Sequence, residues 1–412
     1  MEYKVAGIDV HKKMLAVVIT DVAAEDEYCF QRRKFGTTAS DLIALATWLA
    51  EEGVKEGVME STAQYWKPVW QALEPKCQLF LAQAHSNRAP GGRKRDFADA
   101  ERLVKRHVAG ELIVSFVPDP EQRLWRTMTR TKYQLTRDRV RLHSQLEAFL
   151  EETRIKLSSW VSDLLGVSAK RMLRAVAEGE KDVARIARLA DPGLKATQAQ
   201  LRDALSAAAT LSDVHRQLLK LFLERLDVIE SQMATLECLI SEALRKHGDA
   251  VQRLAVIPGY GVDSAQQVIA EVGPQAATFP SAGQLSSWVG CCPGREESAG
   301  VSKSNRSPKG NRQMRRILNQ VANAAIKAKG SLFQLLYRRL MPRIGHFKAI
   351  WAVANRICRL TWKILHEGAT YEERGPRLHA QAAKRSANRA IRRLRALGYE
   401  VTLKRSQPEA TA

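Results

Sequence analysis

Four acidic side chains near the N-terminus have the chemistry and spacing of a metal site. Asp9 and Glu60 each end an apolar segment, where a charge costs stability unless it is paired or binds an ion. Asp96 and Asp99 are three residues apart at the start of a predicted helix, so they share one face. Four carboxylates held together repel one another unless cations lie among them, and their oxygen atoms select Mg²⁺ or Mn²⁺. Two such ions about 4 Å apart stabilise the attacking and leaving oxygens of phosphodiester transfer.

Each carboxylate also has a purely structural explanation. Asp96 could cap a helix, Asp99 could be a solvated acid in the first turn, and Glu60 could simply end a strand. Their joint placement on the expected elements favours the metal site.

A second chemistry is predicted further along the chain, around Ser298. Small residues surround this serine, and the arginine-rich segment 309–316 follows, so its hydroxyl could meet a scissile phosphate. By spacing alone the choice stays open, because other serines compete: Ser302, Ser304 and Ser307.

Backbone and side-chain groups for binding phosphate are predicted in the same region. Gly259 and Gly261, within residues 257–265, resemble the turn of a helix-hairpin-helix, where glycine lets the backbone approach a phosphate. A plain turn between two helices uses glycine as well. The basic side chains predicted to contact nucleic acid are Lys309, Arg312, Arg315 and Arg316.

The elements that would position the carboxylates follow one order: three strands, helix, strand, helix, strand, helix. Apolar alternation, amphipathic periodicity and polar turns place them at about 5–7, 14–19, 28–35, 40–52, 57–60, 62–73, 78–82 and from 96 onward. This is the order of the α/β ribonuclease H-like fold. In that fold the first and fourth strands are neighbours and the last helix packs across them, so the four carboxylates converge.

From residue 120 the pattern changes to long helices with apolar stripes. The first stripe is Leu124, Met128, Thr131, Leu135, Asp138, Leu142 and Phe149, and the second is Leu219, Phe222, Leu226, Ile229, Met233, Leu236 and Ile240. Alternating spacing of three and four predicts a coiled-coil pair, within one chain or between two. A shorter helical insert at 151–212 contains the break Asp191-Pro192-Gly193.

The chain of 412 residues is too long for one core, and four regions are expected. They are a metal-binding domain at 1–118, a helical coiled-coil region with its insert at 119–247, a mainly α domain carrying the candidate serine at 248–340, and a C-terminal helix with a basic tail at 341–412.

Charge is distributed very unevenly. Of the net charge of +21, nearly all belongs to residues 301–412, with 25 Lys and Arg against 5 Asp and Glu. A field of one sign suits a polyphosphate partner, although a solvated basic tail is the alternative. The six cysteines lack the paired spacing of a zinc site, and no apolar run reaches the roughly 18 residues of a membrane span. A cytoplasmic location is therefore expected.

Several motifs together resemble the insertion-sequence-110 family of transposases, DNA-inverting (Piv-type) relatives included, over residues 5 to about 365. They are Gly7-Ile8-Asp9-Val10-His11-Lys12, Met59-Glu60-Ser61-Thr62, Arg93-Lys94-Arg95-Asp96-Phe97-Ala98-Asp99-Ala100, Pro258-Gly259-Tyr260-Gly261 and Ser298-Ala299-Gly300. The resemblance implies a RuvC-like domain whose D-E-D-D metal set is Asp9, Glu60, Asp96 and Asp99, then a coiled coil and a transposase domain whose catalytic serine is Ser298. Ala299 stands at the second position of the family's S-S-G motif, and Arg95 stands where members often have threonine.

The resemblance also implies a reaction and its partners. Ser298 attacks DNA and forms a covalent phosphoserine while a Mg²⁺ (or Mn²⁺) site assists. A structured non-coding RNA of a bacterial mobile element guides the reaction by pairing with donor and target DNA. Dimers that associate into tetramers are expected in the synapse.

Two other functions stay open. A RuvC-like metal-dependent junction nuclease would cut with water, and Ser298→Ala would remain active. A nucleic-acid-binding protein without chemistry would show no metal dependence in any DNA transaction.

Overall fold

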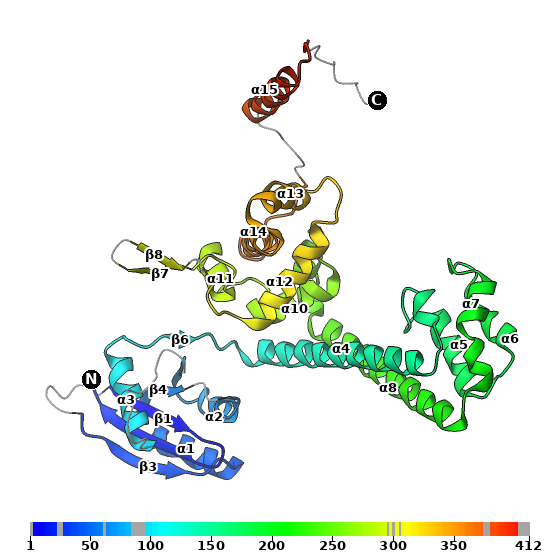
Figure 1. Ribbon diagram of the computed structural model, residues 1–412. Helices are drawn as coiled ribbons and strands as arrows, with labels where there is room; N and C mark the ends of the chain where they lie inside the picture. The colour runs from blue at the N-terminus through cyan, green and yellow to red at the C-terminus, as the bar shows by residue number, and fades with distance from the viewer. Residues whose placement is uncertain are drawn as a thin grey trace. The chain divides into compact units, whose positions relative to one another are not determined.

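The computed structural model describes residues 3–22, 28–60, 63–83, 96–294, 296–298, 301–304, 306–373 and 380–402, with the backbone alone at 296–298, 301–304 and 380–386 (Figure 1). The chain forms two compact units, residues 1–119 and 120–412. The first is a mixed α/β unit and the second is mainly helical, which confirms the predicted succession of an α/β region and a helical one.

A six-stranded sheet forms the centre of the first unit. Its strands are β1 (Lys4–Val10), β2 (Leu15–Asp21), β3 (Gln31–Phe35), β4 (Val54–Glu60), β5 (Gln78–Ala82) and β6 (Val114–Ser115). They lie in the order β3-β2-β1-β4-β5-β6, in which β1, β4 and β5 are parallel and the remaining pairs are antiparallel. The predicted neighbourhood of the first and fourth strands is confirmed, whereas the two-residue strand β6 had no sequence signal.

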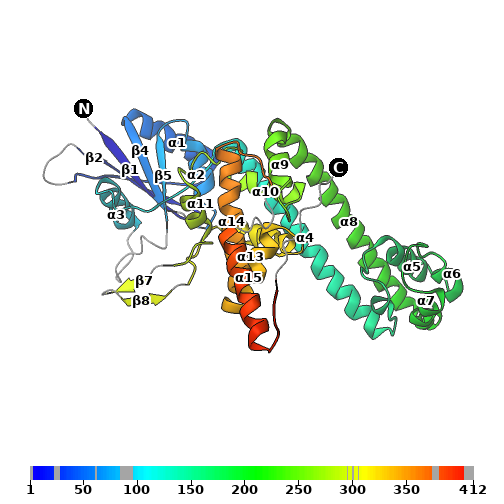
Figure 2. The same cartoon turned by 90° about the horizontal axis from the view of Figure 1, so that it is seen from above.

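Helices cover both faces of this sheet (Figures 1 and 2). Helices α1 (Ala39–Glu51) and α2 (Trp66–Leu73) pack on one face through Leu45, Leu49 and Leu73. Thr38 and Asp41 form a capping box that fixes where α1 begins. Helix α3 (Asp96–Val108) packs on the opposite face, where a helix from about Asp96 was predicted; residues 84–95 lie outside the described residues.

Two long helices of the second unit, α4 (Pro120–Glu152) and α8 (Asp213–Ala243), run antiparallel in the same chain. The ion pairs between Arg139 and Glu230 and between Lys132 and Glu237, at 3.4 and 2.9 Å, give their register. The predicted coiled-coil pair is thus intramolecular here, and the stripe predicted on α8 is buried or half-buried.

The stripe predicted on α4 is wrong in its first half. Leu124 is 56% exposed, whereas Trp125 and Thr129 are buried. The reason is that this half of α4 packs on helix α10 (Val262–Val272) as well as on α8, so a different face is covered. The amide of Gln122, for example, donates to the Ala270 carbonyl of α10 at 3.1 Å.

The insert between the long helices is helical, as predicted. It contains α5 (Val167–Ala177), α6 (Val183–Ala187), α7 (Gln198–Ala204) and the short 3₁₀ turns η1 (Leu157–Ser159) and η2 (Ser206–Thr210). Its core is shared with the adjoining ends of α4 and α8. The predicted break is a turn in which the Gly193 N–H donates to Asp191 Oδ1 at 2.9 Å.

The rest of the second unit is built around one buried helix, α14 (His346–His366). Against it pack α9 (Gly248–Ala255), α11 (Ala282–Val289), α12 (Arg312–Ala325) and α13 (Leu332–Ile344), and the turn η3 (Arg245–His247) precedes α9. A hairpin of β7 (Glu296–Ser298) and β8 (Val301–Ser304) precedes α12, and α15 (Ala380–Ala396) follows α14. The boundary expected at residue 340 therefore falls inside α13. Among the described residues, no helix is both long and apolar enough to span a membrane.

Candidate functional site

The parallel pairing of β1 with β4 puts Asp9 and Glu60 on the same face of the sheet. Gly7 lies opposite Val58, and Ile8 lies opposite Met59. Side chains alternate along a strand, so Asp9 shares the face of Gly7 and Glu60 shares the face of Val58. This is the face that α3 covers.

Gly7 sets how closely α3 approaches that face. A Cβ atom at residue 7 would lie 2.3 Å from the Ala100 carbonyl oxygen of α3. The contact brings the first turn of α3, with Asp96 and Asp99, to the end of β1 where Asp9 lies.

The closest group in this region consists of Asp9, His11 and Asp96. His11 Nε2 lies 2.9 Å from Asp9 Oδ2 and 3.7 Å from Asp96 Oδ1. One ligand atom from each of the three residues lies within 4.8 Å of the others. Two carboxylates and an imidazole at this separation can hold a divalent cation.

The electrostatics of Asp9 favour a bound cation. Burial raises the pKa of Asp9 above its ordinary value; His11 opposes the rise, and the carboxylates of Asp99 and Asp96 add to it. A cation among these oxygen atoms would relieve both the burial of the Asp9 charge and its repulsion by the other two carboxylates. The residues present thus fit a divalent metal ion.

The other two predicted ligands are Asp99 on α3 and Glu60 on β4. Asp99 Oδ1 accepts from Arg102 Nη1 at 2.5 Å, while Lys34 Nζ lies 3.5 Å from Asp96 Oδ2. Glu60 is half-buried as the last residue of β4. The structure therefore brings Asp9 and Asp96 together. Asp99 contributes to the raised pKa of Asp9, and the register of β4 puts Glu60 on the same face of the sheet as Asp9.

His11 was not predicted as a site residue. The available signal was its position two residues after Asp9, directly after the end of β1. If the strand alternation continued for one more residue, both side chains would face the same way, and that spacing could have identified the histidine.

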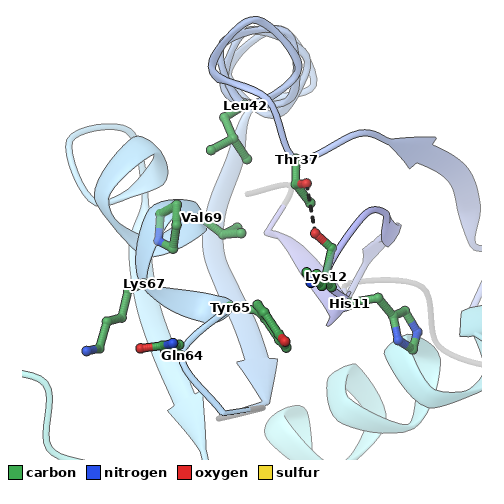
Figure 3. Close-up of a pocket in the computed structure, with 9 residues that line it drawn as sticks. His11, Lys12, Thr37, Leu42, Gln64, Tyr65, Lys67 and Val69 are labelled. Atoms are coloured by element: carbon green, nitrogen blue, oxygen red, sulfur yellow. Dashed lines mark hydrogen bonds between the residues drawn. The ribbon is translucent and has the colours of Figure 1, made fainter.

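A pocket of about 410 Å³ lies beside His11 (Figure 3). It is lined by His11, Lys12, Thr37, Leu42, Gln64, Tyr65, Lys67, Pro68 and Val69. The Thr37 hydroxyl donates to the Lys12 carbonyl at 3.1 Å and so joins the turn between β1 and β2 to the segment before α1. The lining combines polar side chains with apolar ones.

The candidate nucleophile lies in the second unit. Ser298 is the last residue of β7 and pairs with Val301 of β8, so it directly precedes the turn of the hairpin. Its side chain lies outside the described residues, as do those of Ser302 and Ser304 on β8. The Ser298 backbone is thus held by pairing between two short strands.

The glycine-rich turn between α9 and α10 has a packing role. Gly259 has φ of +88°, and a Cβ atom there would lie 2.4 Å from the Val321 carbonyl oxygen of α12. Glycine at 259 is therefore required by contact with α12, whether or not a phosphate binds. Gly261, the N-cap of α10, has no atom within 4 Å of such a position. Phosphate binding by this turn stays a prediction.

Two of the predicted DNA-binding arginines make extensive contacts within the protein. Arg315 donates to the carbonyls of Gly290 and Pro308 and lies over the Trp351 ring at 4.5 Å. Arg316 lies over the Tyr133 ring at 3.8 Å, and burial lowers the pKa of its guanidinium.

Lys309 and Arg312, by contrast, are exposed. Of the four basic side chains predicted to contact nucleic acid, these two are the most accessible to a ligand in solution.

Comparison with known proteins gives consistent matches in both units. Residues 6–155 match a DEDD-type transposase model, and residues 251–338 match the model of the transposase IS116/IS110/IS902 family. A 43.6 kDa protein of insertion element IS110 from Streptomyces coelicolor is 28% identical over 37% of this chain and 37% of its own length. The transposase for insertion sequence element IS1111A from Coxiella burnetii is 32% identical over 32% and 36%.

A 42 kDa protein of insertion element IS900 from Mycobacterium paratuberculosis is 26% identical over 35% of this chain and 36% of its own length. The matched part thus spans little more than a third of each of these three relatives.

Proposed function

Because the chain belongs to the IS110 family of insertion-sequence transposases, we propose that it catalyses DNA strand transfer with a metal-binding carboxylate site and a serine nucleophile. The observation that carries this proposal is the group of Asp9, His11 and Asp96, whose ligand atoms lie within 4.8 Å. The strand order β3-β2-β1-β4-β5, with β1, β4 and β5 parallel, supports a ribonuclease H-like (RuvC-like) assignment of the first unit.

In the proposed reaction the Ser298 hydroxyl oxygen attacks a DNA phosphorus atom. A phosphoserine bond forms, one phosphodiester P–O bond breaks, and the leaving sugar oxygen takes up a proton. Attack by a hydroxyl of another strand then reverses the process and frees the serine. One phosphodiester is broken and one is formed, so the exchange needs no outside energy source.

The carboxylates Asp9, Glu60, Asp96 and Asp99 would hold Mg²⁺, with Mn²⁺ as the alternative. The ion supplies positive charge next to oxygens that become negative during transfer. Within the chain, His11 orients the Asp9 carboxylate at 2.9 Å, and the adjoining pocket offers room for a nucleotide of the bound strand.

The partners of the proposed reaction are the element ends, target DNA and a structured guide RNA, and the active species is a dimer that forms tetramers. The resemblance of the motifs supports the RNA and the assembly. The excess of basic residues in 301–412 supports a polyphosphate partner.

One alternative has a specific observation in its favour. The carboxylate group lies wholly within the first unit, so a metal-dependent junction nuclease could cut DNA with water and without Ser298. Such an enzyme would release free ends and no protein–DNA adduct.

The deciding experiment is adduct trapping on a DNA substrate with the element RNA and Mg²⁺. Wild type is compared with Ser298→Ala and with Ser302→Ala, a matched serine on the opposite strand of the hairpin. A protease-sensitive adduct that survives Ser302→Ala and is lost in Ser298→Ala supports the proposal. Cleavage without an adduct in all three proteins would replace it with the junction nuclease.

A further inference from the structure

The end of the α13–α14 pair exposes an unusual combination of aromatic and basic side chains. We infer that Phe347 at this end stacks on an unpaired base of bound DNA. The α13–α14 tip is defined here as residues 341–348, all of which are exposed. The inference rests on the proposed function for the identity of its partner, DNA.

Phe347 is the most exposed of several apolar side chains at this tip. Its side chain is 82% exposed, and Met341 and Ile344 beside it are 42% and 39% exposed. A single exposed apolar residue is ordinary on a protein surface. Three within seven residues, at the end of a helical hairpin, form a small apolar contact surface.

The Phe347 ring has an aromatic neighbour, His346. His346 contacts it edge to face, with ring centroids 5.4 Å apart. His346 is in turn fixed by Tyr337, whose hydroxyl lies 2.8 Å from His346 Nδ1. Gly345, with φ of +78°, makes the sharp turn that carries the ring beyond the last turn of α13. A neighbour that restricts the ring's rotamers reduces the side-chain entropy that is lost when a base stacks on it.

The charges around the ring favour a polyanion. Arg339 and Arg343 lie four residues apart on α13, and Lys348 follows the ring; all three are exposed. In the part of the chain that the structure describes, none of the three pairs with an acidic side chain within 4 Å. The sequence from 298 to 366 contains no Asp or Glu at all.

An unpaired base fits this surface better than a protein does. A second copy of the tip would bring cations against cations, which is unfavourable. A base attached to its phosphates offers both a π-face for the ring and negative charge for the arginines, as in single-strand binding surfaces. Strand exchange also requires bases to leave their stacks, and an exposed ring can take the place of a neighbour.

The inference is tested by measuring the affinity of the full-length protein for one DNA sequence as a single strand and as a duplex. Phe347→Ala is expected to weaken single-strand binding roughly 5- to 100-fold, the usual effect of removing one stacking partner. Phe347→Trp should keep or improve it. The affinity for the duplex should change less than about 2-fold. The fluorescence of a 2-aminopurine base in the single strand should be quenched on binding by wild type and by Phe347→Trp, but not by Phe347→Ala.

Two control variants separate stacking from charge and from general surface effects. Arg343→Gln should lower the salt slope of single-strand binding by about 0.7, whereas Phe347→Ala should leave that slope unchanged. Leu239→Ala, at an apolar residue of α8 that is 51% exposed, should have no effect.

Equal losses on single strand and duplex would overturn the inference, as would unchanged binding by Phe347→Ala. The inference would also be overturned if Phe347→Ala weakened binding to RNA of the same sequence but not to DNA. Weakened binding to anionic vesicles, with DNA binding unchanged, would overturn it as well. The adduct experiment is independent: a missing adduct with an intact Phe347 effect refutes the serine mechanism alone. An intact adduct without a Phe347 effect refutes the stacking alone.

Discussion

Asp9 and Glu56 show how neighbouring strands of one sheet give carboxylates different roles. Both face α3, but Glu56 lies towards the far end of that helix, where its Oε2 is 2.7 Å from His107 Nε2. Asp9 lies at the start of α3 among other carboxylates, and burial raises its pKa. Glu56 thus has a side-chain partner within the protein, whereas Asp9, close to two other carboxylates, is the position where a cation would be stabilising.

This difference predicts the effect of metal on stability. Adding Mg²⁺ should raise the melting temperature of the wild type, because a ligand at 100 times its Kd stabilises the folded state by about 2.7 kcal/mol. Asp9→Asn should abolish the metal-dependent rise and strand cleavage, while DNA binding persists. Glu56→Gln, the matched control on the same face of the sheet, should retain the metal-dependent rise in thermal melts. A metal-dependent rise in Asp9→Asn would contradict the proposed site.

A second difference at the scale of single residues concerns the basic side chains near α12. Substituting the exposed Lys309 and Arg312 by Gln should lower the salt slope of duplex DNA binding by about 0.9 for each phosphate that the protein no longer neutralises. Arg315→Gln should instead cost about 1.5–3 kcal/mol of stability, because its guanidinium donates to two backbone carbonyls. Salt titrations and urea unfolding of the same variants distinguish the two roles. An unchanged slope for the double variant would exclude direct phosphate binding by these two side chains.

At the scale of elements, the site depends on how closely β1 and α3 pack. Gly7 lets the backbone of α3 approach β1, so the position of Asp96 relative to Asp9 is set by a residue that carries no functional group. Gly57 on β4 provides a comparison, because a Cβ atom there would meet the Leu79 side chain at 2.8 Å rather than a helix backbone. A side-chain end can move aside, whereas a helix must shift as a whole.

Gly7→Ala should therefore cost about 1–3 kcal/mol of stability, the usual range for overpacking, and weaken metal binding by moving α3 outward. Gly57→Ala should cost less and leave metal affinity unchanged, since Leu79 can take another rotamer. Calorimetric titration with Mn²⁺, together with urea unfolding, measures both effects. Equal metal affinity in wild type and Gly7→Ala would show that the packing of α3 does not set the site.

At the scale of the whole molecule, a buried carboxylate joins three helices of the second unit. Glu271 of α10 is buried; it pairs with Arg130 of α4 at 2.8 Å and accepts from Asn311 Nδ2, at the N-cap of α12, at 3.0 Å. Arg126 of α4 also contacts it. One side chain thus ties the long helical pair to the region that carries Gly259 and Ser298.

Glu271→Ala should cost about 1.5–3 kcal/mol, because it removes the buried carboxylate that accepts from Arg130 and Asn311 and lies beside the largely buried Arg126. Glu237→Ala, which removes a 57% exposed carboxylate that pairs with Lys132, should cost at most about 1 kcal/mol. Lys132 keeps a partner in Asp263, 2.6 Å away. Urea unfolding followed by tryptophan fluorescence compares the two, and similar midpoints would show that Glu271 is not a structural junction.

Periodicity and residue chemistry in the sequence were enough to predict most of the strands and helices and the candidate carboxylates. Alternation located the first five strands, and the spacing of three and four located the buried stripe of α8. The positions of Asp9 and Glu60 at strand ends predicted that they share an edge of the sheet with the start of α3. These inferences hold because the geometry of a strand or helix follows from local sequence.

Only the tertiary structure decided which part of the chain each helix face and each side chain packs against. Leu124 has the spacing of a core residue but is exposed, because α10 covers another face of α4. Arg315, predicted to contact DNA, donates to two carbonyls of its own chain, and Gly259 makes room for α12. His11 joined the site through its distance to Asp96, 85 positions away in the chain. Such contacts join segments remote in sequence, and no local pattern encodes them.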